Sequence, residues 1–287
     1  MIDVCNIHEI HALLERHGFH FSKAKGQNFL TQAWVPAQLA ELAGVDEGCG
    51  VLEVGPGFGP LTQQLCTRAK KVVAVELDRR LEPVLAETMA GFDNLELVFA
   101  DVLKTDLASL VREKLAGLRL QACANLPYYI TSPVLTRLVE SGLFEAMTVM
   151  VQKEVAQRIC AKPGTADYSA FSVFCQYYTE PRLLFDVPPS CFIPQPKVTS
   201  SVITLARRQT PVAQVEDEAL FFRLVRASFA MRRKTLLNGL SAGFPQVGKA
   251  ALAEILALCG LAPDVRGETL GIPEFAAIAN EISRRYP

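Results

Sequence analysis

The chain has 287 residues, half of them hydrophobic, and a formal net charge of −1 at pH 7. This length is enough for a full α/β core and a small second domain, and the near-neutral charge argues against polyanion binding over the whole surface. No apolar stretch is long enough to span a bilayer, so we expect no membrane association. The eight cysteines are scattered without a C-x-x-C pair, which favours reduced thiols in a cytoplasmic protein.

The first predicted element is a short amphipathic helix over residues 7–17, where apolar residues recur at helical spacing. The four histidines lie in or near it: His8, His11, His17 and His20. Histidine pairs spaced by three residues are compatible with a metal site, but no cysteine or carboxylate completes a convincing ligand set. We therefore favour surface histidines and expect no metal.

From residue 50 to 150 apolar strands alternate with helical patterns, which is typical of β-α-β units in a parallel sheet. The predicted strands are 51–54, 71–75, 95–99, 120–124 and 147–151, with helices from about 61, over 79–90 and around 133–141. Two further strands, 182–187 and 200–206, flank a proline-rich bend too long for a tight hairpin, and they would add an antiparallel edge.

Beyond residue 206 the periodicity is helical only, over 219–230, 234–240, 249–259 and 273–283. We therefore predict two domains, 1–206 and 207–287, the second small and all-α. Between residues 207 and 234 seven basic residues stand against three acids. A phosphate-binding surface and an ordinary solvated helix face both fit this local charge.

A glycine-rich turn follows the first strand of the sheet, in Glu53-Val54-Gly55-Pro56-Gly57-Phe58-Gly59. Glycines let the backbone turn sharply and approach a ligand closely. The spacing G-x-G-x-G departs from the dinucleotide pattern G-x-G-x-x-G. It matches instead the turn that accommodates the methionine portion of S-adenosylmethionine.

Acidic residues end the next two strands. Glu76 can accept both ribose hydroxyls, which fits NAD enzymes as well, and Asp101 offers a carboxylate to an adenine amine. The alternative for any single strand-end acid is a helix N-cap, which we favour for Asp78. Because the carboxyl ends of parallel strands meet at one sheet edge, Glu76 and Asp101 together predict a nucleoside site.

The most specific stretch is Asn125-Leu126-Pro127-Tyr128, which follows the strand 120–124. An amide side chain, backbone carbonyls in a proline-restricted turn and an aromatic face suit a planar amino-heterocycle. The exocyclic amine of adenine is a poor nucleophile, because its lone pair is delocalised into the ring. Acceptors aimed at its N–H bonds would favour attack on an electrophile. A half-buried tyrosine in a strand-end turn is the alternative for these four residues alone.

Taken in order, these motifs closely resemble the ribosomal RNA adenine N6-dimethyltransferase family of the KsgA/RsmA type, the small-subunit rRNA dimethyladenosine transferases. Further matching pieces are residues 26–30, 152–158, 162–164 with Tyr168, 192–198 and 233–236, so the resemblance spans roughly residues 22–240. It implies a Rossmann-like class I S-adenosylmethionine-dependent methyltransferase sheet with a helical C-terminal domain. The Ala24-Lys25 stretch is not the family's commonest version, and Tyr129 stands where many members have asparagine.

The resemblance also implies roles for individual residues. Asn28 and Leu30 would close over the cofactor, and Asn125 would lie between the cofactor and the target amine. Gly55 and Gly57 would lie beside the methionine portion of the cofactor. The Arg232, Arg233, Lys234 cluster of the helical domain would bind phosphates of a folded RNA. The expected activity is transfer of methyl groups from S-adenosylmethionine to N6 of two adjacent adenines near the 3′ end of small-subunit (16S) rRNA. The expected partner is the 30S subunit, with the enzyme a monomer.

Three alternatives remain. A large-subunit (23S) rRNA adenine methyltransferase of the antibiotic-resistance type would share most motifs, although residues 192–198 and 233–236 favour the small-subunit enzyme. A non-catalytic ribosome-assembly or transcription factor would not need the intact Asn125 loop. A DNA adenine methyltransferase is the weakest alternative, since the resemblance is to the RNA family throughout.

Overall fold

The computed structural model describes residues 2–19 and 28–286, and it divides into two compact units. The first comprises Met1–Ala156 and Glu180–Arg207, and the second Gln157–Thr179 and Arg208–Pro287. The sequence predicted one boundary, between residues 206 and 207. The structure also assigns 157–179 to the helical unit, because apolar side chains of this segment, such as Tyr168 and Val173, share the core of the C-terminal helices.

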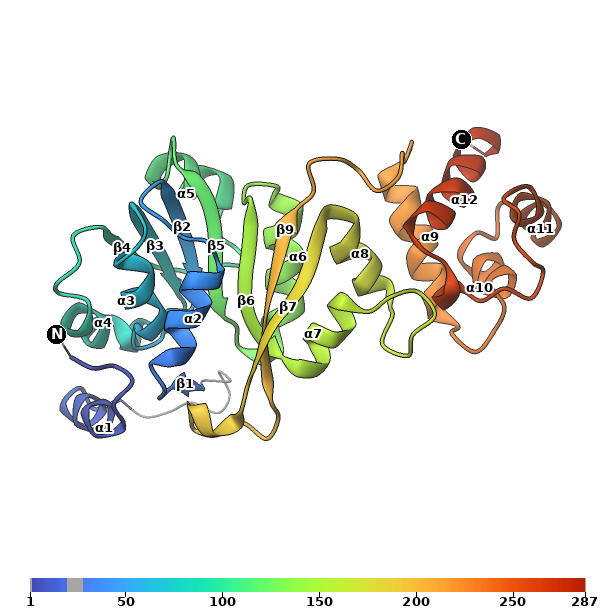
Figure 1. Ribbon diagram of the computed structural model, residues 1–287. Coiled ribbons are helices and arrows are strands. Elements are labelled where there is room, and N and C mark those ends of the chain that lie inside the picture. Colours follow the sequence, from blue (N-terminus) through green and yellow to red (C-terminus); the bar gives the residue numbers. More distant parts are fainter. Residues whose placement is uncertain (1, 20–27, 287) are drawn as a thin grey trace. The chain divides into compact units, whose positions relative to one another are not determined.

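The first unit is built on a seven-stranded sheet of order β4-β3-β2-β5-β6-β9-β7 (Figure 1). The strands are β2 (Cys49–Val54), β3 (Lys71–Glu76), β4 (Leu95–Phe99), β5 (Arg119–Asn125), β6 (Ala146–Gln152), β7 (Thr179–Val187) and β9 (Ser200–Arg207). β4, β3, β2, β5 and β6 pair in parallel, and β9 pairs antiparallel with β6. The predicted α/β fold with an antiparallel edge is confirmed.

Helices connect the parallel strands, as right-handed crossovers require. They are α3 (Pro60–Cys66), α4 (Glu82–Thr88), α5 (Leu107–Lys114) and α6 (Thr131–Ser141), whereas α1 (Ile7–Arg16) and α2 (Trp34–Leu42) precede β2. α2 and α3 pack side by side, and their apolar faces share a core with Val51, Val72 and Cys123 of the central strands. This packing fixes the carboxyl ends of β2, β3 and β5 relative to one another.

Two short strands lie outside the main sheet. β1 (Phe29–Leu30) pairs antiparallel with β8 (Phe192–Ile193), with Phe29 opposite Ile193. The sequence did not predict either, because two residues carry no measurable periodicity. Their pairing brings residues 28–30 to the sheet edge where the strand-end motifs lie.

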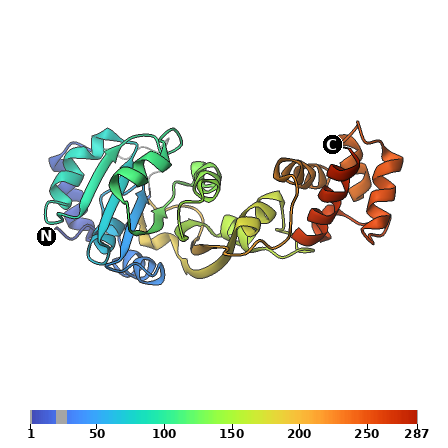
Figure 2. The ribbon, with the colours of Figure 1, turned by 90° about the horizontal axis from the view of Figure 1, so that it is seen from above.

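The second unit is helical. The chain enters it within α7 (Lys153–Cys160), and α8 (Ala170–Tyr178) packs against α9 (Glu218–Ala230). α10 (Leu236–Gly243), α11 (Lys249–Leu258) and α12 (Ile272–Arg285) complete a bundle with α9 (Figures 1 and 2). Its core includes the fully buried rings of Phe221, Phe244 and Phe275. In the described ranges, no helix combines the length and apolar character needed to cross a membrane.

Candidate functional site

A pocket in the first unit lies at the carboxyl ends of β2, β3, β4 and β5, where open α/β sheets bind ligands. It is lined by residues 28–30, 53–57, 60–61, 75–78, 81, 100–102 and 125–130. The structure brings together Gly55, Gly57, Glu76, Asp101 and residues 125–128, which the strand-end motifs placed at one sheet edge. Asn28 and Leu30, which the resemblance implied, line the same pocket.

The glycine turn after β2 leaves space that a side chain would fill. Gly55 and Gly57 have φ of +71° and +61°, the left-handed region that favours glycine. A Cβ at Gly55 would meet no atom within 4 Å, whereas a Cβ at Gly57 would lie 3.0 Å from the Phe29 ring. Gly55 thus keeps the pocket open, and Gly57 allows the segment carrying Asn28 to pack closely.

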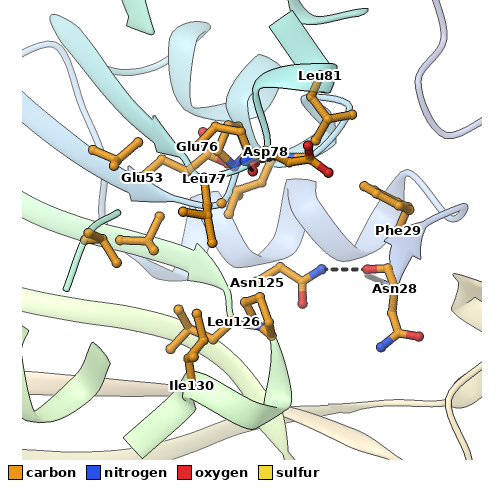
Figure 3. A pocket seen from close by; sticks show the side chains of 18 of the residues that line it. Asn28, Phe29, Glu53, Glu76, Leu77, Asp78, Leu81, Asn125, Leu126 and Ile130 are labelled. Carbon is orange, nitrogen blue, oxygen red and sulfur yellow. Dashed lines mark hydrogen bonds between the residues drawn. The ribbon is translucent and has the colours of Figure 1, made fainter. Parts of the chain in front are cut away.

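Glu76 at the end of β3 is only 7% exposed. The backbone N–H of Asp78 donates to its Oε1 at 2.7 Å, and that of Gly57 donates to its Oε2 at 3.4 Å. Burial raises the pKa of the Glu76 carboxyl, and these backbone hydrogen bonds oppose the rise. The two hydrogen bonds hold the carboxylate in one orientation beside the glycine turn (Figure 3).

Asp78 has the capping role that we predicted for it. It precedes the 3₁₀ turn η2 (Arg79–Leu81), and its Oδ1 accepts the N–H of Arg80 at 3.3 Å. The Arg80 side chain also contacts this carboxylate, with Nε donating to Oδ1 at 2.9 Å and Nη2 to Oδ2 at 2.6 Å.

Asp101 lies in the turn after β4. Its Oδ1 accepts the N–H of Leu103 at 2.9 Å, and its Oδ2 lies 3.8 Å from the Lys104 ammonium. Arg137 of α6 donates to the Thr105 carbonyl, which ties this turn to the helix that follows the Asn125 loop. The turn is held by α6 as well as by its own hydrogen bonds.

The loop after β5 is fixed by several hydrogen bonds. Asn125 Nδ2 donates to the Asn28 carbonyl at 3.3 Å, and the N–H of Leu126 donates to the Met150 carbonyl at 3.1 Å. The Pro127 carbonyl accepts the Ile130 N–H and the Thr131 hydroxyl, both at 3.2 Å. Because the amide nitrogen is engaged by Asn28, the Asn125 oxygen points away from Asn28 and stays available as an acceptor (Figure 3).

Sequence reasoning missed Glu53 as a site residue. Glu53 lines the pocket and is 1% exposed, and burial raises the pKa of its carboxyl to about 8. Its Oε2 makes no hydrogen bond within the described part of the chain. The signal was present, since Glu53 is an acid inside β2, a strand whose six residues are all buried.

Two aromatic residues follow one another in the 3₁₀ turn η3 (Tyr128–Ile130) and differ in exposure. Tyr128 is half-buried, and its hydroxyl lies 2.8 Å from Ser200 Oγ. Tyr129 is 55% exposed and still lines the pocket. Tyr128 can offer a ring face inside the site, while Tyr129 stands at its rim.

Three of the four histidines lie within the described residues. His8 and His11 are exposed, as predicted, and His17 Nε2 contacts Glu87 at 2.6 Å. Searched over residues 2–19 and 28–286, the chain has no group of three side chains able to hold a metal ion. His20, the Ala24-Lys25 stretch, Gly26 and Gln27 lie outside the described residues.

The basic cluster lies in the second unit, between α9 and α10, and all three side chains are exposed. They are not equivalent. Arg232 Nη2 donates to the Ala166 carbonyl at 2.6 Å and lies 3.4 Å from that of Thr165. Arg232 therefore links the 157–179 segment to the C-terminal helices, which leaves Arg233 and Lys234 as the clearer candidates for phosphate contacts.

Comparisons with known proteins place these features in context. The family described as "Ribosomal RNA adenine dimethylase" matches residues 18–282. Proteins named "Ribosomal RNA small subunit methyltransferase A" are similar along nearly the whole chain. That of Geobacillus kaustophilus is 46% identical, covering 94% of both chains, and that of Bacillus cytotoxicus is 46% identical, covering 98% of both.

Solved structures agree on the fold. A dimethyladenosine transferase from Plasmodium falciparum aligns with a TM-score of 0.72 at 24% identity, covering 89% of this chain and 98% of that one. The 23S rRNA methyltransferase ErmE aligns with a TM-score of 0.68 at 26% identity, covering 89% of this chain and 99% of that one.

Proposed function

The chain belongs to the ribosomal RNA adenine dimethylase family, and on that premise we propose that it dimethylates N6 of two adjacent adenines near the 3′ end of small-subunit rRNA. It is an enzyme that uses S-adenosylmethionine as methyl donor. The observation that carries the proposal is the Asn125 amide, whose nitrogen is engaged by Asn28 and whose oxygen is left for a substrate amine, in the pocket of Glu76 and Asp101.

The residues present fit the methyl donor. The open space at Gly55 suits its methionine portion, and Glu76 and Asp101 offer carboxylates to its ribose and its adenine. The buried Glu53 oxygen without a hydrogen bond suits the donor's ammonium group, because a buried carboxylate is stabilised by an adjacent cation. Asn28 and Leu30 close the same pocket from the β1 side.

The target amine is activated by acceptors. When bound, S-adenosylmethionine supplies a methyl group on a positively charged sulfur. The adenine amine would attack this methyl, with a C–N bond forming as the S–C bond breaks. S-adenosylhomocysteine would leave, and the amine proton would pass to water. Asn125 Oδ1 and a loop carbonyl hold the amine for attack, so positioning and electrostatics provide the acceleration without a general base.

Of the two loop carbonyls, that of Leu126 is the better acceptor for the amine. The Pro127 carbonyl already accepts two hydrogen bonds, from Ile130 N–H and the Thr131 hydroxyl. A carbonyl oxygen has two lone pairs, so that of Pro127 is fully used. Pro127 instead restricts the turn, and the ring of Tyr128 stacks on the target base.

Small-subunit rRNA is a better supported substrate than large-subunit rRNA. The relatives named as small-subunit enzymes are 46% identical, against 26% for ErmE. A non-catalytic assembly factor would have no need of the engaged Asn125 amide or of the buried carboxylates in the pocket.

The second unit is proposed to bind rRNA phosphates through Arg233 and Lys234, with Arg232 maintaining their scaffold. We propose that the enzyme acts on the 30S subunit as a monomer. All eight cysteines are free thiols, which suits a reducing compartment such as the cytoplasm, where we expect this enzyme to act.

The direct test is incubation of the protein with labelled S-adenosylmethionine and unmethylated small subunits, followed by mapping of the modified bases. We expect dimethyladenine at two adjacent positions near the 3′ end. Label that appears only in large-subunit rRNA, or in no rRNA, would contradict the proposal.

A further inference from the structure

The ring of Tyr128 is held at its far end by a residue 72 positions away in the chain. The Tyr128 hydroxyl and Ser200 Oγ lie 2.8 Å apart, a normal O–H···O hydrogen bond. Ser200 is fully buried, and its hydroxyl reaches the loop from β9, outside all of the motifs that carry the cofactor pocket.

The sheet fixes the position of Ser200. Ser200 pairs with Gln152 in the antiparallel register of β6 and β9. One residue earlier, the Thr199 carbonyl accepts the N–H of Lys153 at 3.0 Å. Ser200 Oγ is therefore part of the same rigid sheet that carries Asn125, since β5 pairs with β6 at Asn125 and Met150.

The bond to Ser200 restrains the direction of the Tyr128 ring. A tyrosine side chain turns about two bonds, and its staggered rotamers place the ring in different directions. Tyr128 is half-buried, so one part of the ring stays accessible while the hydroxyl end is enclosed. Burial raises the pKa of the phenol, and the hydrogen bond with Ser200 opposes the rise. A hydrogen bond at the hydroxyl fixes the ring, because it restrains the point farthest from the backbone.

We propose that Ser200 is a positioning residue for methyl transfer: it holds the Tyr128 ring where the target adenine stacks. This inference rests on the proposed function, because it takes Tyr128 as the stacking residue. Ser200 itself touches neither adenine nor methyl donor, and it acts through the tyrosine hydroxyl.

The effect should be larger for the second methyl than for the first. An unmethylated adenine amine has two N–H bonds for the acceptors Asn125 Oδ1 and Leu126 carbonyl, whereas a once-methylated amine has one. Since only one acceptor can then bind the amine, the position of the base depends more on stacking. Loosening the Tyr128 ring should therefore release more product at the monomethyl stage.

The test compares Ser200→Ala, Tyr128→Phe and the double variant on unmethylated small subunits, with mono- and dimethyladenine quantified by mass spectrometry. Ser200→Ala should lower kcat about 3- to 10-fold, leave the KM for the methyl donor within about twofold, and raise the share of monomethyladenine. Tyr128→Phe should do the same. The double variant should be no worse than either single one, because both remove one hydrogen bond.

Ser201→Ala is the matched control. Ser201 is the neighbouring fully buried serine, and its hydroxyl donates to Asp186 Oδ1 at 2.7 Å, away from the pocket lining. The Ser201→Ala variant should leave kcat and the ratio of mono- to dimethyladenine unchanged. Wild-type turnover and product ratio in Ser200→Ala, multiplied losses in the double variant, or equal losses in Ser201→Ala would each overturn the inference. Full activity of Asn125→Ala would instead refute the proposed function.

Discussion

We expect the pocket of the first unit and the basic cluster of the second to bind their ligands by opposite physical means. At the pocket edge, Glu53 and Glu76 are almost completely buried and backbone groups hold Glu76 in one orientation. At the corner between α9 and α10, Arg233 and Lys234 are exposed. Desolvated, fixed groups give chemistry and selectivity, whereas exposed cations give attraction that salt screens. Variants in the first region should therefore produce larger and more specific effects than variants in the second.

The largest effect is expected from Asn125→Ala. It removes the acceptor oxygen for the target amine, and loss of one fixed polar group at a reacting centre costs about 100- to 1000-fold in kcat. Affinity for S-adenosylhomocysteine, measured by calorimetry, should change less than about threefold. Turnover close to wild type would contradict the role given to Asn125.

Glu76→Ala should act on cofactor binding instead. Losing a charged hydrogen bond to the ribose costs about 1.5–3 kcal/mol, so the dissociation constant should rise roughly 10- to 150-fold. At saturating methyl donor, kcat should recover most of its wild-type value. An unchanged dissociation constant would show that the ribose does not bind at Glu76 at the end of β3.

Glu53 predicts a pH dependence of stability. Its pKa rises from the ordinary 4.5 to about 8 in the folded protein, so the folded state binds a proton that the unfolded state has released. Glu53 therefore contributes fully to the free energy of unfolding below pH 4.5. This contribution is lost as pH rises to about 8, and the free energy of unfolding falls by up to about 1.4 kcal/mol per pH unit.

Glu53→Gln keeps the shape of the side chain and removes this titration. Chemical unfolding between pH 5 and 8 should show wild-type stability falling more steeply than that of the variant. The burial of Glu76 contributes a fall of the same sign to both proteins, so the difference reports Glu53. Parallel curves would show that the Glu53 carboxyl is ionised in the folded protein.

The smallest effect is expected at the basic corner. Replacing Arg233 and Lys234 by Gln should weaken rRNA binding several-fold and reduce its salt dependence by about 0.7 for each phosphate that is no longer neutralised. Arg232→Gln is the matched comparison, since it should lower the melting temperature by removing the hydrogen bond to the Ala166 carbonyl. If the salt slope does not move in the double variant, this corner is solvated surface.

Local sequence patterns predicted the residues that line the pocket better than they predicted the contacts that hold those residues in place. The glycine turn, Glu76, Asp101 and the loop 125–128 each lie at the end of a strand or directly after it, and parallel strands bring their carboxyl ends to one edge. Asp78 likewise followed from a local capping rule. Each of these inferences needs only a few adjacent residues.

The contacts that hold the pocket residues in place join residues that are far apart in the chain. The Asn28 carbonyl meets Asn125 from 97 residues away, and Ser200 meets Tyr128 from 72. The 157–179 segment belongs to the helical unit because its buried side chains share a core with residues that come after residue 208. Periodicity in one stretch carries no information about such partners. Glu53 was missed for a different reason, since it was read as part of the glycine motif rather than as an acid in a buried strand.

The central claim is that the Asn125 amide faces the methyl donor across the target amine. A crystal structure with bound S-adenosylhomocysteine tests it most directly. We predict the homocysteine portion beside Gly55, the ribose hydroxyls on Glu76, and the sulfur directed at the Asn125 oxygen with space for an adenine amine between them. A ligand bound with its sulfur directed away from Asn125, or bound outside this pocket, would contradict the account.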